Sequence, residues 1–89
     1  MTRRIAEGEK ESSVNIVPLL KRLTETSGVS GYEHQVREIV RDEFELYADE
    51  VEPDTLGNLI AVKHGTGAPP RRSVMLAIHM DEIGLVVSQ

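Results

Sequence analysis

A nearly continuous apolar run close to the end of the 89-residue chain, "VMLAIHMDEIGLVVS", is interrupted by His79, Asp81 and Glu82. The part that leads to the histidine, "SVMLAIH", is typical of a strand that is covered on both faces of a sheet, because half-exposed strands alternate apolar and polar residues. Such a strand needs more protein around it than a chain of this length supplies. We therefore expect an incomplete α/β domain.

Two helices are predicted ahead of the strands. In "NIVPLLKRLTETSG" the apolar residues recur at helical spacing, Asn15 is the predicted N-cap, and Gly28 is predicted to end the helix in a left-handed conformation. In the next stretch, "SGYE" places Ser30 as the N-cap and Glu33 three residues later, which is the capping-box pattern. An amphipathic second helix is expected to follow and to run to about Tyr47.

From Glu50 onward the pattern becomes that of strands. "EVEPD" predicts a short edge strand, because Pro53 cannot donate a ladder hydrogen bond. "GN" at 57–58 predicts a tight turn, and "LIAVK" after it predicts a second strand. "HGTGAPPRR" predicts a loop, and "SVMLAIH" the third strand. The polar residues 1–13 are expected to form a flexible N-terminal extension.

Composition narrows the possible partners and ligands. The net charge is −5 and the basic residues are scattered, which argues against nucleic acid and anionic membranes as partners. The chain has no cysteine, so a metal ion would have to be held by His, Asp or Glu. It contains no apolar run of membrane-spanning length and no secretory signal pattern, from which a cytoplasmic protein is expected.

His79 lies where the predicted buried strand ends, and side chains at strand ends of α/β sheets often line ligand sites. Asp81 follows two residues later, so in an extended chain it points to the same side as His79. Its carboxylate can accept the proton of one imidazole nitrogen and leave the other nitrogen for a metal ion. The alternative is a histidine that is merely hydrogen-bonded at the boundary of the strand.

The remaining candidates are weaker. Glu82 could be a third polar group of the site, although a carboxylate at this position is more often simply solvated. His64 lies in the predicted loop and His34 in the first turn of the predicted second helix, and both are expected to be solvated. No pair of histidines has the spacing of a known zinc motif.

Three stretches in order, "LLKRLTETSGVSGYEHQVREIV", "DTLGNLIAVKHG" and "VMLAIHMDEIGLVV", resemble the N-terminal part of the M42 metallo-aminopeptidases over residues 16–89. The resemblance implies a catalytic domain with a mixed α/β sheet, interrupted by a β-rich dimerisation domain. It also implies a dinuclear centre of zinc or cobalt ions with a bridging water, a peptide substrate, a cytoplasmic location, and homo-oligomers from dimers to dodecamers.

Carried onto this chain, the resemblance assigns His79 as a metal ligand and Asp81 as the catalytic carboxylate that orients it. The other ligands and the general base of the family lie further along its chains. Residues 14–89 are thus expected to be the N-terminal part of the catalytic domain, inactive alone. The alternatives are a non-catalytic small α/β module that binds a partner or a full-length homologue, and a product that does not fold.

Overall fold

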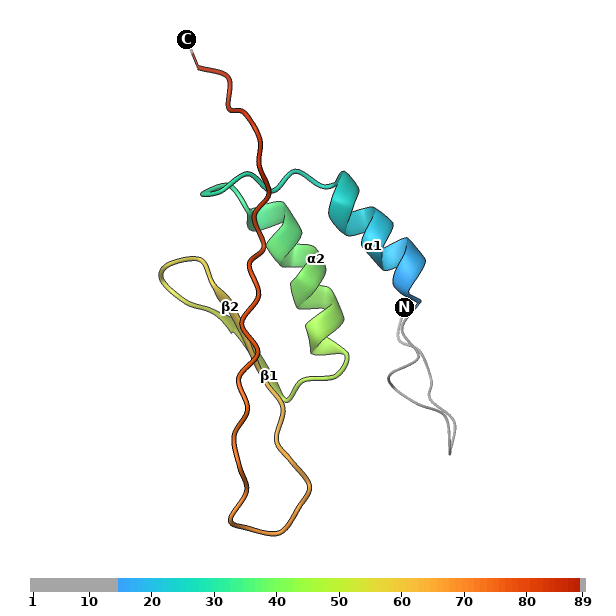
Figure 1. Ribbon diagram of the computed structural model, residues 1–89, viewed down its shortest axis with the longest axis vertical. Helices are drawn as coiled ribbons and strands as arrows, with labels where there is room; N and C mark the ends of the chain where they lie inside the picture. The colour runs from blue at the N-terminus through green and yellow to red at the C-terminus, as the bar shows by residue number, and fades with distance from the viewer. Residues whose placement is uncertain (1–14, 89) are drawn as a thin grey trace.

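The computed structural model describes residues 15–88, and the predicted extension at 1–13 lies outside them. The elements are helix α1 (Ile16–Glu25), helix α2 (His34–Glu45), strand β1 (Glu50–Pro53) and strand β2 (Leu59–Val62). Figure 1 shows the two helices next to each other, with the hairpin of β1 and β2 beside α2. This order confirms the predicted fold class, two N-terminal helices followed by strands of a small α/β region.

Helix α1 begins where its sequence predicts and ends earlier. Asn15 is its N-cap residue, although the Asn15 side chain makes no capping hydrogen bond. The helix stops at Glu25, the C-cap Thr26 is extended, and its hydroxyl donates to the carbonyl of Arg22. Gly28 was predicted to end this helix, and that prediction is wrong. Gly28 lies beyond the helix end and its φ is not positive.

The second helix also starts later than predicted. Its N-cap residue is Glu33, so the capping box based on Ser30 is not formed. Instead, the Tyr32 N–H donates to the Val29 carbonyl at 2.7 Å, closing a turn across Ser30 and Gly31. Gly31 has a φ of 87°, the conformation that the third position of a type II turn requires. The glycine therefore turns the chain before α2 can begin.

The core of this part of the chain is small. Val36 on α2, with 6% of its surface exposed, is the only buried hydrophobic residue within 15–88. Other apolar residues of α1, α2 and β1 are half-buried, among them Leu23, Ile39 and Val51. Burial of apolar surface is the main source of stability, so the contacts between α2 and its neighbours hold this region together.

β1 and β2 form an antiparallel hairpin in which Pro53 pairs with Leu59 and Glu50 with Val62. The loop between them is organised by Asp54. Its Oδ1 accepts from the Leu56 and Asn58 backbone N–H groups at 2.9 Å each, and its Oδ2 accepts from Asn58 Nδ2 at 2.8 Å. The Asp54 side chain thus supplies the hydrogen-bond acceptor for two backbone N–H groups of the turn.

Acid is expected to weaken this hairpin. The hydrogen bond from the Asn58 side chain is the largest cause that lowers the pKa of Asp54 below its ordinary 3.8. A depressed folded-state pKa means that the stabilisation is complete above 3.8 and is lost as the pH falls through the lower value. In melting curves recorded from pH 6 downward, Asp54→Asn should be less stable than wild type at pH 6. The two should converge in strong acid, and a constant difference would contradict this.

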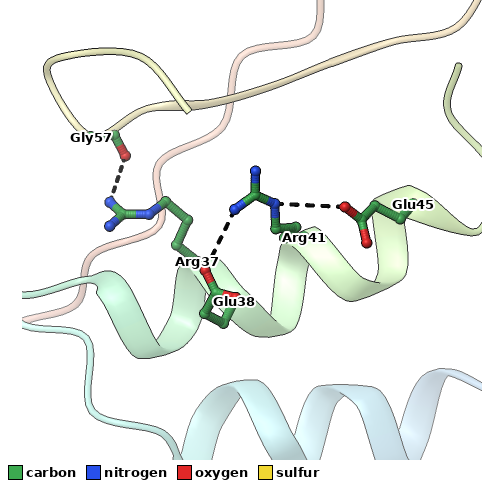
Figure 2. Close-up of polar contacts among 5 residues, drawn as sticks. All are labelled: Arg37, Glu38, Arg41, Glu45 and Gly57. Carbon is green, nitrogen blue, oxygen red and sulfur yellow. Dashed lines mark hydrogen bonds and ion pairs between the residues drawn. The ribbon is translucent and has the colours of Figure 1, made fainter. Parts of the chain in front are cut away.

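Helix α2 holds the same turn from the other side. Arg37 donates from a guanidinium nitrogen to the Gly57 carbonyl at 3.0 Å (Figure 2). Further along the helix, Arg41 contacts Glu38 at 3.8 Å and Glu45 at 3.7 Å, as Figure 2 also shows. In both ion pairs the glutamate is exposed and Arg41 is half-buried, and such surface pairs contribute little. The part-buried Arg37 contact connects the helix layer to the hairpin.

Replacing Gly57 by alanine is expected to destabilise the chain by about 1–3 kcal/mol, because Gly57 has a φ of 93°. A Cβ there would also come within 3.3 Å of the Arg37 guanidinium. The matched control is Gly67→Ala, because Gly67 has ordinary φ and open space around its Cβ position. Chemical denaturation of both variants measures the difference, and equal midpoints would contradict the expectation.

The run at 73–79, predicted as the third strand, forms no strand in the structure. Four of its large apolar side chains are 84–88% exposed: Val74, Met75, Leu76 and Ile78. Figure 1 shows this segment as an extended trace. A strand exists only when a neighbour supplies its hydrogen bonds, and within residues 15–88 none pairs with this run.

No helix in the described part of the chain is long and apolar enough to cross a membrane.

Candidate metal-ligand site

His79 and Asp81 face each other. The His79 Nδ1 atom lies 3.0 Å from the Asp81 Oδ1 atom and 3.0 Å from the Asp81 backbone oxygen. The histidine side chain is 83% exposed and the aspartate side chain 39%. The predicted contact between imidazole and carboxylate is therefore present, and the ring is not buried in apolar packing.

This geometry has a direct chemical consequence. Both groups near Nδ1 are acceptors, so the arrangement favours the tautomer in which Nδ1 carries the proton and donates it. The lone pair then lies on Nε2, on the far side of an exposed ring. A neutral imidazole with one nitrogen held by a carboxylate is the usual form of a histidine that binds a metal ion. The roles of His79 and Asp81 themselves remain predictions.

A loop far earlier in the chain supports this segment. The Glu82 N–H donates to the Gly28 carbonyl at 2.9 Å, and Val29 pairs with Glu82 in an isolated parallel bridge. The loop between α1 and α2 thereby holds the chain immediately after Asp81. Sequence reasoning did not identify this contact.

A surface depression lies at this junction. It is lined by residues from both segments: Val29, Ser30, His79, Asp81, Glu82, Ile83 and Gly84. Glu82, considered as a third polar group of the site, therefore does lie beside the pair, and its side chain is exposed. Ser30 does not cap α2. It lines the depression on the side of the interhelical loop.

The other two histidines lie elsewhere. His64 follows β2, where its N–H donates to Asp49 Oδ2 at 2.6 Å and its Nε2 lies 3.6 Å from Glu50 Oε2. The first of these contacts is the largest cause that lowers the pKa of Asp49. His34 is exposed at the start of α2. Between residues 15 and 88, no three His, Asp or Glu side chains come together in a way that could hold a metal ion.

Comparison with known proteins finds similarity to relatives that are named aminopeptidases. A family model described as AMPT matches residues 17–39, which comprise most of α1, the interhelical loop and the first half of α2. No solved structure matches the chain significantly.

Individual relatives extend the match. A protein of Acetivibrio thermocellus named "Putative aminopeptidase" is 50% identical over 70 residues, which are 79% of this chain and 20% of that protein. The lysyl aminopeptidase of Pyrococcus furiosus is 51% identical over 71 residues, 79% of this chain and 19% of the relative. The chain thus spans about a fifth of the length of these relatives. It resembles the N-terminal part of M42-type aminopeptidases, as its motifs predicted.

Proposed function

We propose that this chain forms the N-terminal part of a metal-dependent aminopeptidase, which removes N-terminal residues from peptides at a dinuclear centre. The observation that carries the proposal is the His79–Asp81 pair, with Nδ1 held at 3.0 Å and the ring exposed. The names of the relatives support the peptidase class. The cytoplasmic location that the resemblance implies belongs to the same proposal.

The residues present fit one ligand position of such a centre. His79 would hold one ion through Nε2, and Asp81 would fix the ring. When bound, zinc or cobalt would supply an activated water and polarise the scissile carbonyl. A catalytic zinc site takes three protein ligands, so a single imidazole leaves the centre incomplete. Further ligands and the general base are proposed to come from other residues, with the 89-residue chain inactive by itself. Homo-oligomerisation of the complete enzyme is part of this proposal.

A chimaera tests the proposal. The 71 aligned residues of the Pyrococcus furiosus lysyl aminopeptidase are replaced by the matching segment of this chain. Hydrolysis of lysyl-p-nitroanilide is then measured before and after removal of metal by a chelator, and after zinc or cobalt is returned. We expect hydrolysis that is lost with the metal and restored with it. A correctly folded chimaera with no metal-dependent hydrolysis would contradict the proposal, and the 89-residue chain is the negative control.

A second candidate, a non-catalytic module that binds a partner, is favoured by the exposed run at 73–79. Extended apolar segments without a sheet neighbour tend to pair with other chains. Sedimentation and melting of the purified 89-residue chain test this second candidate. A monomer that melts cooperatively would argue against a requirement for a partner.

A further inference from the structure

The segment that carries the His79–Asp81 pair, residues 79–84 (the site segment), lies against the loop between α1 and α2, and each of the two contributes a glycine to the contact. Gly28 is buried beside Val36, and a Cβ atom built on Gly28 would lie 2.7 Å from Val36 Cγ2. The same Cβ would lie 3.7 Å from the Met80 carbonyl oxygen, which belongs to the site segment. Real Cβ atoms essentially never approach a neighbour as closely as 2.7 Å. A side chain at Gly28 would therefore push the loop away from α2.

Gly84 is the counterpart in the site segment. A Cβ atom there would collide with Val29 Cγ2, and the Val29 Cβ atom would be 3.7 Å away. Neither Gly28 nor Gly84 has a positive φ, so their backbone conformations are open to other residues. Space, and not backbone conformation, is what makes glycine necessary at these two positions.

These contacts lead to the histidine in a continuous series. Val36, the buried residue of α2, packs on Gly28, and the Gly28 carbonyl accepts from the Glu82 N–H. Glu82 is the neighbour of Asp81, and two oxygens of Asp81 lie 3.0 Å from the His79 ring. Every step is a hydrogen bond, a packing contact or a peptide bond. The orientation of the exposed ring is thus connected to the best-buried point of the fold.

We propose that Gly28 and Gly84 are positioning residues for the His79–Asp81 pair, because only their lack of a side chain lets the interhelical loop hold the site segment. Describing the pair as a metal-ligand site rests on the proposed function, but the positioning itself does not. The same contact explains why the depression has one wall from the loop and the other from the site segment.

The test uses the ¹⁵N-labelled 89-residue chain and two readouts that need no metal. Hydrogen exchange of the Glu82 amide reports the bond to Gly28, and the imidazole ¹⁵N shifts of His79 report the tautomer. We expect Gly84→Ala to speed Glu82 exchange about fivefold, the factor for one ordinary hydrogen bond, and to move the His79 shifts toward a tautomer mixture. Gly28→Ala should do the same. The control Gly67→Ala, which meets open space, should leave both readouts unchanged.

A rescue variant separates this mechanism from general unfolding. In Val29→Ala/Gly84→Ala the colliding methyl group is gone, so Glu82 protection and the His79 shifts should return toward wild type. Unchanged readouts in Gly84→Ala, or no recovery in the double variant, would overturn the proposal. So would a wild-type chain whose Glu82 amide exchanges as freely as an exposed loop. Failure of the proposed function would instead appear as a chimaera without metal-dependent hydrolysis in which these NMR readouts behave as expected.

Discussion

Replacing His79 by glutamine in the aminopeptidase chimaera is expected to reduce metal-dependent hydrolysis more than about 100-fold, because loss of an outer-shell partner alone typically costs 10–100-fold. Glutamine is similar in length and polar, so an 83% exposed position should tolerate it without loss of folding. The amide nitrogen has no lone pair for a metal ion, whereas the imidazole Nε2 does. The measurement is kcat/KM for lysyl-p-nitroanilide across a titration with zinc or cobalt.

The matched controls are the two other histidines of the chain. The control variants are His34→Gln and His64→Gln. His34 lies at the exposed start of α2, and His64 lies after β2, where its neighbours are Asp49 and Glu50. Neither lines the depression beside Asp81. Both variants should retain the hydrolysis rate of the parent chimaera. If His79→Gln retained it too, the ring would be a boundary residue without a metal role.

Local patterns predicted most of the fold. The apolar spacing that begins at Ile16 and continues beyond His34 depends only on neighbours within a few turns, and both helices formed. The turn motif at 54–58 likewise satisfies its own hydrogen bonds through Asp54, so the hairpin was predictable. The contact between His79 and Asp81 spans two positions and was predictable for the same reason.

Features that depend on distant residues were not predictable. Glycine often ends a helix, but Gly28 lies beyond the end of α1, where Val36 leaves no room for a side chain. Ser30 has the spacing of an N-cap, yet the turn through Gly31 moves the start of the helix to His34. The apolar run at 73–79 has the pattern of a strand, but a strand forms only where a neighbouring strand is present, and none pairs with this run within residues 15–88. The contact between Glu82 and the interhelical loop was not predictable, because it depends on which distant segments of the chain meet.

Replacing Asp81 by asparagine is expected to lower metal affinity and hydrolysis by about tenfold, the lower end of the 10–100-fold range for outer-shell partners of metal-binding histidines. Asparagine keeps the shape and an oxygen that can accept from Nδ1, but it removes the negative charge that makes the imidazole a better ligand. The Asp81 backbone oxygen also lies 3.0 Å from Nδ1, and no side-chain substitution removes it. The loss should therefore be smaller than in His79→Gln.

A metal titration separates the two roles that Asp81 could have. If the carboxylate acts by positioning His79, the Asp81→Asn chimaera should regain most of its kcat at saturating zinc or cobalt. If it takes part in the reaction directly, the loss in kcat should persist at every metal concentration. Glu82→Gln is the control, because Glu82 lines the same depression and carries the same charge, but in the described part of the chain no hydrogen bond or ion pair joins it to the His79 ring. Equal losses in the two variants would mean that general negative charge near the ring, and not the Asp81–His79 contact, determines its behaviour.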